Sequence, residues 1–308
     1  MNKKAYIFTG YLGSGKTTSM VKSIEEFFKD KKVLVIVNEF GEVGIDGKVL
    51  SAELQGQGVV ELNEGCICCV LYDELNKVLS DIQSKYDFDY LFIETSGLSE
   101  PFPIYSALVS LGYDVESVIC LIDSLNYEKY KDDDVFKYQI GSANIIVLNK
   151  IDLVEQSKIE SIKNEIFSLK EKYNLKNFLT GEYLIPKYEL ITTTYGFIPE
   201  YVFTEIDLPI SRDVSATKDD HSHKDYVKNV DYYPNDALSY DQFIKIIKKF
   251  PKNLIRSKGI LKFKDVDVPL LFNYTYGNYT FEEFPQEVDK GILVSIFLNE
   301  LKMVSCKS

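Results

Sequence analysis

The chain has 308 residues, 45% of them hydrophobic, which suffices for one large domain and one smaller domain, each with its own core. Its 47 acidic residues exceed its 35 basic residues and give a formal net charge of -12, which argues against nucleic acid and anionic membranes as partners. The longest apolar runs have the length of buried strands rather than of a membrane span, and we expect no secretory leader, so the five cysteines should be reduced thiols of a cytoplasmic protein.

The first motif in the chain is a predicted phosphate-binding loop. An apolar run at residues 5–9 precedes Gly-Tyr-Leu-Gly-Ser-Gly-Lys-Thr at 10–17, and a segment with helical apolar spacing follows. This strand–loop–helix context suits the G-x-x-x-x-G-K-[ST] pattern, in which backbone N–H groups and a helix N-terminus hold a polyphosphate. Lys16 should reach the β and γ phosphates, and the Thr17 hydroxyl should bind Mg²⁺. The predicted phosphate-binding residues are Gly10, Gly13, Ser14, Gly15, Lys16, Thr17 and Thr18.

Two irregular segments with metal-binding side chains come next. Residues 38–47 contain three glycines and three carboxylates, and we expect a loop at the carboxyl edge of a sheet, with a solvated acidic turn as the alternative. Cys66, Cys68 and Cys69 stand just before a predicted helix, whose N-terminus favours the thiolate. Thiolates suit Zn²⁺ or Cu(I), and Glu42 or a water would complete a tetrahedral site. A redox pair and inert buried thiols remain alternatives.

A strand predicted at 90–93 leads into Glu94-Thr95-Ser96-Gly97. An acidic residue at the end of a core strand, followed by a glycine whose N–H can approach a γ-phosphate, is typical of nucleotide switches. We interpret Glu94 as a group that binds a water on Mg²⁺, and Lys16, Thr17, Glu94 and Gly97 as the catalytic set. Leu98 stands where many regulatory GTPases place a water-orienting Gln, which predicts slow hydrolysis.

A predicted strand at 144–148 ends in Asn149-Lys150-Ile151-Asp152. The Asp152 carboxylate can accept from N1–H and the 2-amino group of guanine, Asn149 can reach the other edge of the base, and the Lys150 stem can cover its face. Adenine lacks this donor pattern, so GTP should be preferred over ATP by ~10⁴ or more. Asp123 ends the predicted strand at 116–122, and we favour a capping role for it over a metal contact.

The rest of the chain predicts a second domain. We expect a nucleotide-binding domain at 1–210, a linker at 211–230, and a small α+β domain at 231–308. Ser239 is the expected N-cap of a helix ending near 250, and strands are predicted at 254–263, 268–276 and 292–298. The linker carries the only two histidines, His221 and His223, whose part in metal binding is left open.

Taken together, these motifs make the chain resemble the CobW family of metallochaperones, within the SIMIBI class of P-loop GTPases. The resemblance covers nearly the whole chain and includes residues 256–259, Arg-Ser-Lys-Gly. It implies an α/β fold, with a mostly parallel sheet flanked by helices and a small α+β domain. It also implies a GTPase that uses GTP and Mg²⁺, binds a metal, often Zn²⁺, at the cysteine cluster, and delivers it to a client metalloprotein that the C-terminal domain helps to choose. Glu94 fits, because Glu in place of Asp is a hallmark of this family.

One departure from the family and two alternative functions stay open. The chain has only two histidines where many relatives carry a long His-rich linker, which does not favour metal storage there. One alternative function is a GTP-dependent activator of a cobalamin or other metallocofactor enzyme without metal delivery. A second is a thiol redox sensor that binds nucleotide. A homodimer is also left open.

Overall fold

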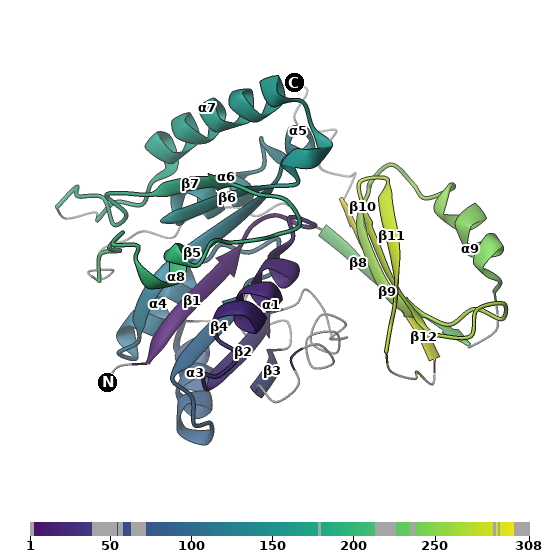
Figure 1. Ribbon diagram of the computed structural model, residues 1–308, viewed down its shortest axis with the longest axis horizontal. Coiled ribbons are helices and arrows are strands. Elements are labelled where there is room, and N and C mark those ends of the chain that lie inside the picture. Colours follow the sequence, from purple (N-terminus) through teal and green to yellow (C-terminus); the bar gives the residue numbers. More distant parts are fainter. Residues whose placement is uncertain are drawn as a thin grey trace. The chain divides into compact units, whose positions relative to one another are not determined.

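The computed structural model describes residues 3–38, 54, 58–62, 72–177, 180–212, 226–234, 238–285, 288 and 290–298. The chain forms two compact units, Met1–His221 and Ser222–Ser308, and each has its own sheet (Figure 1). The positions predicted to bind a transition metal, which are Glu42, Cys66, Cys68 and Cys69, lie outside the described residues. His221 and His223, whose part in metal binding is left open, lie outside them as well.

The first unit is built on a seven-stranded sheet in the order β3-β2-β4-β1-β5-β6-β7. All its strand pairs are parallel, so the carboxyl ends of all seven strands meet at one edge. This confirms the predicted α/β fold with a parallel sheet. The strands are β1 (Lys4–Thr9), β2 (Val33–Asn38), β3 (Gly58–Leu62), β4 (Tyr90–Glu94), β5 (Asp114–Asp123), β6 (Ile145–Asn149) and β7 (Glu189–Thr192).

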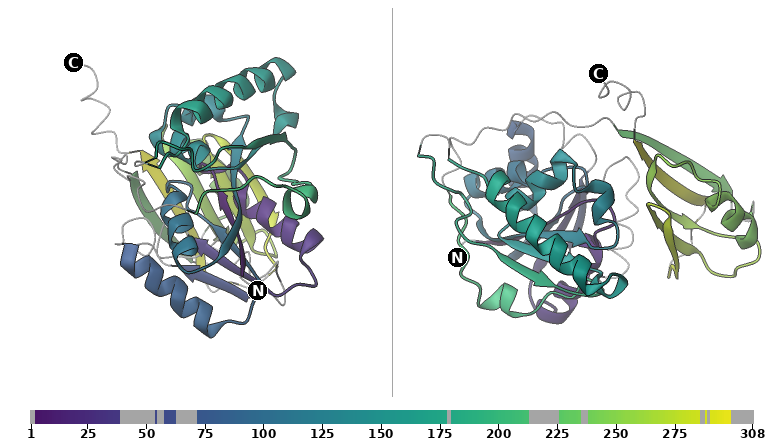
Figure 2. Two further views of the ribbon diagram at one scale, coloured as in Figure 1. Left: turned by 90° about the vertical axis from the view of Figure 1, so that its left-hand side faces the viewer. Right: turned by 90° about the horizontal axis from the view of Figure 1, so that it is seen from above.

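Helices cover both faces of this sheet, with α1 and α8 on one side and α3 on the other (Figure 2). The strand residues Tyr6 and Phe92 pack with Met20 and Ile24 of α1 on one face of the sheet. Ile7, the next residue of β1, lies on the opposite face and is fully buried as well. Both faces of the sheet are therefore buried, as is usual for parallel sheets. The helices are α1 (Lys16–Phe27), α3 (Tyr72–Lys85), α4 (Phe102–Ser110), α5 (Tyr127–Tyr130), α6 (Asp134–Gly141), α7 (Gln156–Tyr173) and α8 (Tyr201–Thr204), with a 3₁₀ turn η1 at Ile151–Leu153.

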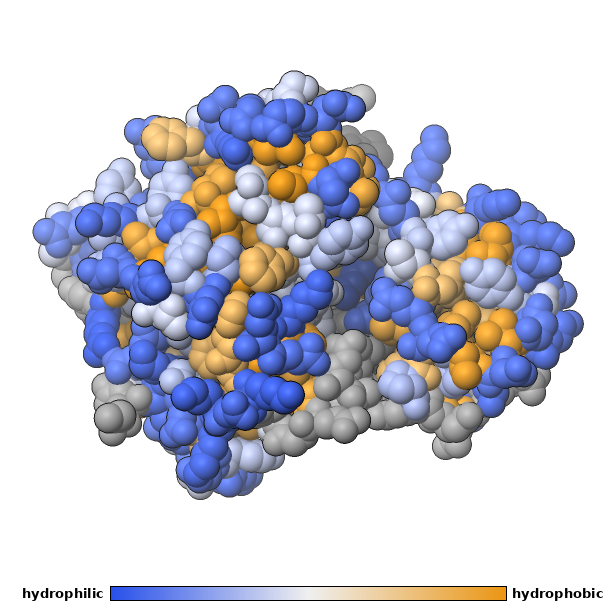
Figure 3. Space-filling view, in the orientation of Figure 1, coloured by the Kyte–Doolittle hydropathy of each residue, from blue (hydrophilic) through white to orange (hydrophobic). Residues whose placement is uncertain are grey.

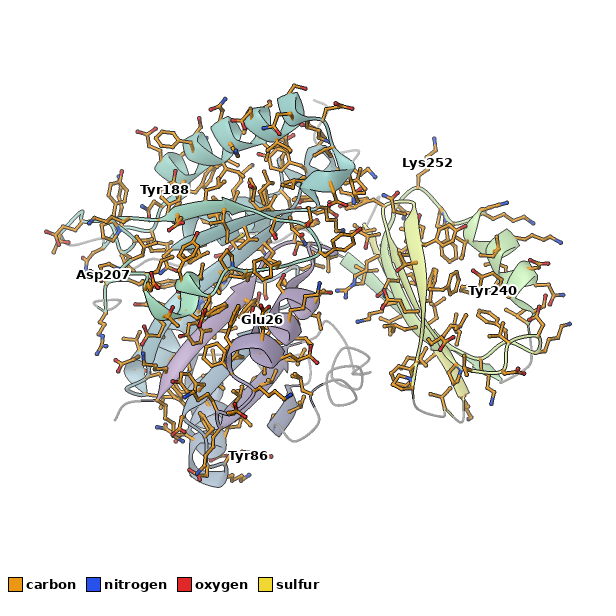
Figure 4. The ribbon with its side chains drawn as sticks, in the orientation of Figure 1. Glu26, Tyr86, Tyr188, Asp207, Tyr240 and Lys252 are labelled. Carbon is orange, nitrogen blue, oxygen red and sulfur yellow. The ribbon has the colours of Figure 1, made fainter. Side chains whose placement is uncertain are left out.

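The described residues of the second unit form a five-stranded antiparallel sheet and the helix α9. Its order is β11-β10-β9-β12-β8, and the core lies between the sheet and α9. Tyr240 at the start of α9 (Figure 4) packs its ring against Phe263 and Phe281. The elements are β8 (Tyr226–Pro234), α9 (Tyr240–Ile247), β9 (Leu254–Leu261), β10 (Leu270–Thr275), β11 (Asn278–Glu283) and β12 (Lys290–Leu298).

The N-cap predicted at Ser239 is confirmed. Its side chain accepts from the Gln242 backbone N–H, and the Gln242 side chain accepts from the Ser239 N–H, which forms a capping box. A difference appears at β8, which begins at Tyr226, so a strand occupies the last residues of the range predicted as a linker. β8 is an edge strand, and edge strands carry the charged residues that make a sequence resemble a linker.

The described surface of the first unit shows hydrophilic side chains along most of its outline, with apolar residues between them (Figure 3). Among the described residues, no helix combines the length and the apolar character that crossing a bilayer would demand.

Candidate nucleotide-binding site

The predicted phosphate loop joins β1 to α1 at the carboxyl edge of the sheet. Gly10, Gly13 and Gly15 have φ angles of 133°, 76° and 100°, which L side chains rarely adopt. A Cβ on Gly10 would lie 2.2 Å from the Leu121 carbonyl oxygen, so the loop also needs glycine to lie against β5. α1 begins at Lys16, within the loop motif, so the backbone N–H groups of its first turn point toward the loop.

The Lys16 ammonium lies within the loop. The side chain is buried, and Nζ donates to the carbonyl oxygens of Gly10, at 3.0 Å, and Tyr11, at 3.4 Å. A buried cation at a helix N-terminus is an arrangement suited to a phosphate chain.

Thr17 and Glu94 meet at the ends of neighbouring elements. The Thr17 hydroxyl donates to Glu94 Oε1 at 3.0 Å, and Glu94 is 5% exposed. β1 and β4 are adjacent, with Phe8 opposite Glu94, which explains how residues 77 positions apart come together. A hydroxyl and a carboxylate are hard oxygen ligands of the kind Mg²⁺ takes, so this pair fits the predicted Mg²⁺ site.

The turn after Glu94 lies directly on the phosphate loop. A Cβ on Gly97 would be 2.8 Å from the Leu12 backbone nitrogen and 2.6 Å from Leu12 Cδ2. The Ser99 N–H donates to the Ser96 carbonyl at 3.2 Å and closes the turn. Glycine at 97 therefore permits the turn after Glu94 to lie against the phosphate loop. The sequence predicts that both contact one nucleotide.

Asn149 connects the guanine-type motif to the phosphate loop. Its Nδ2 donates to the Ser14 carbonyl at 3.0 Å, and its Oδ1 accepts from the N–H groups of Lys150, at 2.8 Å, and Gly196, at 3.0 Å. Asn149 thus makes three contacts within the protein, and its contact with a base stays a prediction. Asp152 lies in η1 and is exposed, which leaves its carboxylate accessible.

Lys150 has a contact that the sequence analysis did not predict. Its Nζ donates to Asp123 Oδ2 at 2.7 Å and to the Gly13 carbonyl at 2.9 Å. Asp123 and Asn149 are opposite each other in the pairing of β5 with β6, so the next residue, Lys150, emerges beside the carboxylate. Asp123 Oδ1 also accepts from the N–H groups of Leu125 and Asn126, which confirms the capping interpretation.

Comparison with known proteins decides the family. Residues 4–176 match the family described as CobW/HypB/UreG, nucleotide-binding domain, and residues 227–297 match the cobalamin synthesis protein cobW C-terminal domain. The chain belongs to the CobW/HypB/UreG family.

Individual relatives of this family member carry zinc-related names. A protein named zinc chaperone CobW from Sinorhizobium sp is 30% identical over 196 residues, covering 53% of this chain and 55% of the relative. Zinc-regulated GTPase metalloprotein activator 1 of Dictyostelium discoideum is 29% identical over 228 residues, covering 61% and 47%. The matched part of the chain thus spans about half the length of these relatives. The crystal structure of Zn(II)-bound YjiA GTPase from E. coli has 20% identity and a TM-score of 0.42, covering 97% of this chain and 95% of that one.

The loop after β7 is part of the site of this CobW-family chain, although the sequence analysis gave it no role. Thr193 accepts from the Ile151 N–H at 3.4 Å, Gly196 donates to Asn149, and the Tyr195 carbonyl accepts from Lys22 Nζ at 2.8 Å. The signal was available, because the loop follows a parallel strand and must emerge at the same edge as the other motifs.

The residues predicted to bind a transition metal lie outside the described residues. Within the part of the chain that the structure describes, no group of three or more His, Cys, Asp or Glu side chains is arranged to hold a metal. Cys120 lies in the core of β5, where burial raises the pKa of its thiol to about 12, as its interpretation as a core residue implies.

Proposed function

We propose that this chain is a GTPase that binds a transition metal, with Zn²⁺ as the expected ion, and transfers it to a client metalloprotein under control of the bound nucleotide. The main support for guanine-nucleotide binding is the 3.0 Å hydrogen bond from Asn149 Nδ2 to the Ser14 carbonyl, which joins the guanine-type motif to the phosphate loop. A single ligand with a guanine base and a phosphate chain would occupy both. GTP and GDP are ligands of that class.

The proposed roles in nucleotide binding follow from these contacts. Residues 10–18 bind the phosphates, chiefly through backbone N–H groups and the Lys16 ammonium. Asp152, which is exposed, accepts from the N1–H and 2-amino group of guanine, while Lys150 lies beside the loop through its bond to Gly13. Asn149 acts mainly by fixing Ser14 and Gly196.

The proposed hydrolysis uses Lys16, Thr17, Glu94 and Gly97. Mg²⁺ held by Thr17 and Glu94 would supply positive charge against the phosphates. Lys16 stabilises charge on the β and γ oxygens, and the Gly97 N–H approaches the γ-phosphate from a turn packed on Leu12. Leu98 offers no group that could orient water, so we expect slow turnover until a partner completes the site.

The metal half of the proposal rests on the sequence and on the names of relatives. The proposed ligands are Glu42, which follows β2, and Cys66, Cys68 and Cys69, which follow β3. β2 lies next to β4, and β3 lies beyond β2 at the edge of the sheet. The carboxyl ends of these parallel strands face the same edge as the phosphate loop. Reduced thiols require a reducing compartment, so we place the protein in the cytoplasm.

A second candidate function is favoured by the name of two relatives, zinc-regulated GTPase metalloprotein activator 1. In that case the nucleotide cycle would remodel a client enzyme without delivering its metal. Metal transfer to the client separates the two candidates, since only the chaperone gives up its ion.

The test measures zinc content and GTP turnover in the wild type, Cys68→Ala and Lys16→Ala. We expect about one tightly held Zn²⁺ per wild-type chain, at least tenfold weaker binding in Cys68→Ala, and turnover that depends on zinc only in the wild type. Cys306→Ala is the matched control, because it removes a thiol outside the cluster and should retain both properties. Equal zinc retention in Cys68→Ala and Cys306→Ala, with turnover insensitive to zinc, would refute the proposal.

A further inference from the structure

Gln139 of α6 is a fully buried amide that contacts the turn after Glu94. Its Nε2 donates to the carbonyl oxygen of Ser99 at 2.9 Å and to that of Gly97 at 3.3 Å. Gln139 belongs to none of the motifs that identify the nucleotide site, and it lies 40 positions from Ser99 in the chain.

The orientation of the Gln139 amide follows from its partners. If the amide were turned over, Oε1 would face two carbonyl oxygens, and acceptor would meet acceptor. In the observed orientation Oε1 is buried and has no hydrogen-bond partner among the described residues. Burying Oε1 without a partner costs free energy, so the two bonds donated by Nε2 must offset that cost.

The same helix also contacts the phosphate loop. Asp133 caps α6 by accepting from the Val135 N–H at 3.0 Å, and its other oxygen accepts from the Tyr11 hydroxyl at 3.4 Å. Tyr11 belongs to the phosphate loop, and its ring stacks on Tyr130 at 4.7 Å with an interplanar angle of 10°. α6 therefore touches, through different side chains, both of the loops that would enclose a γ-phosphate.

Gln139 restrains the turn at two carbonyls, those of Gly97 and Ser99. The Gly97 N–H belongs to the Ser96–Gly97 peptide, whose carbonyl accepts from the Ser99 N–H at 3.2 Å and from the Ser99 hydroxyl at 3.0 Å. Gly97 also lies against Leu12 of the phosphate loop. The orientation of the Gly97 N–H is therefore restrained through this turn, by the phosphate loop and by α6.

We propose that Gln139 is a positioning residue that holds the Gly97–Ser99 turn so that the Gly97 N–H can meet a γ-phosphate, and that it thereby determines how well the protein distinguishes GTP from GDP. This inference rests on the proposed function. GDP has no γ-phosphate, so its binding does not depend on this turn.

The experiment compares the affinities of GDP and of a non-hydrolysable GTP analogue, with Mg²⁺, in the wild type and in Gln139→Met. Met has a similar length and no donor, so the variant loses both bonds with little change in packing. We expect the affinity for the analogue to fall roughly tenfold, as the loss of one or two hydrogen bonds implies, while the affinity for GDP stays within about twofold of the wild type.

Two further variants provide a second test and a control. Gln139→Asn keeps the amide but shortens it by one methylene, and it should lower the affinity for the analogue in the same direction if Gln139→Met does not fold. Ser142→Ala, at the C-cap of the same helix, removes a buried hydroxyl that has no hydrogen-bond partner among the described residues and should leave both affinities unchanged.

The outcomes separate this inference from the function on which it rests. A wild type that binds neither nucleotide would defeat the proposed function. A wild type that discriminates between the nucleotides, with Gln139 variants that discriminate equally well or lose both affinities in parallel, would overturn only the role of Gln139.

Discussion

At the residue scale, Asp123 is a structural centre of the site. It is fully buried and accepts from two backbone N–H groups, from Asn126 Nδ2 at 2.9 Å and from the Lys150 ammonium. Removing one partner of a buried pair is costly, because the donors left behind have been taken out of water. The position therefore links the stability of the β5 end to the placement of Lys150.

We expect Asp123→Ala to lower the free energy of unfolding by about 3–5 kcal/mol, measured by urea denaturation, and to weaken GTP binding by freeing Lys150. The control is Asp87→Ala, since Asp87 pairs with Lys32 at the surface, where both side chains are largely exposed and the change should be close to zero. Similar stabilities for the two variants would show that the Asp123 contacts contribute no more than an exposed pair.

The strand–loop–helix structure predicted around residues 10–17 is confirmed, because it depends on local backbone geometry. The spacing of Gly10, Gly13, Gly15 and Lys16 specifies the loop by itself, because positive φ and a helix start are local properties. The bond between Lys150 and Asp123 was missed because it depends on the register of β5 with β6, which no single stretch of sequence contains.

At the scale of elements, α7 holds the end of α6 through a buried lysine. Lys170 Nζ donates to the carbonyls of Gly141 and Ala143, both at 2.6 Å, and of Ile140, at 3.2 Å. These carbonyls lie at or just beyond the C-terminus of α6, where the regular i to i+4 hydrogen bonds of the helix end. Burial lowers the pKa of Lys170 from 10.5 to about 7.

This pKa predicts a dependence of stability on pH. Between about pH 7 and the ordinary lysine value of 10.5, the unfolded chain binds more protons at this site than the folded chain, so the free energy of unfolding should rise with pH. The slope should approach 1.4 kcal/mol per pH unit, measured by denaturant unfolding between pH 7 and 9, and should vanish in Lys170→Met. Lys163→Met, which changes a half-buried lysine of the same helix that pairs with Glu160, should keep the slope. A flat profile in the wild type would mean that the three carbonyls keep Lys170 charged.

Elements next to a motif or with a clear apolar pattern were predicted from the sequence. The strands β4, β5 and β6 were expected at nearly their observed positions, because each is an apolar run that ends in a motif or a polar residue. β3 and the four-residue helices α5 and α8 were not predicted, because they are too short for a clear apolar pattern to appear. The expected strand at 268–276 is followed by a hairpin into β11, whose turn places Tyr276 and Gly277 at φ 49° and 93° without the usual Asn-Gly or Asp-Gly signal.

At the scale of the whole molecule, the strand order was the feature that could not be predicted from the sequence motifs. Motifs spread from residue 10 to residue 152 were expected to meet because each follows a strand, and parallel strands end at one edge. The order β4-β1-β5-β6 decides which motifs become neighbours, since it puts Glu94 beside the phosphate loop and Lys150 beside Asp123. That order follows from the crossover connections, which periodicity does not reveal.

The two units should also respond differently to nucleotide. Each has a separate sheet and a separate core, so we expect two transitions in calorimetry. A GTP analogue with Mg²⁺ at about 100 times its dissociation constant should stabilise the first unit by about 2.7 kcal/mol, which raises its midpoint by several degrees and leaves the second transition in place. ATP at the same concentration is the control and should shift neither midpoint. A single transition that GTP moves as a whole would mean that the two cores unfold as one cooperative unit.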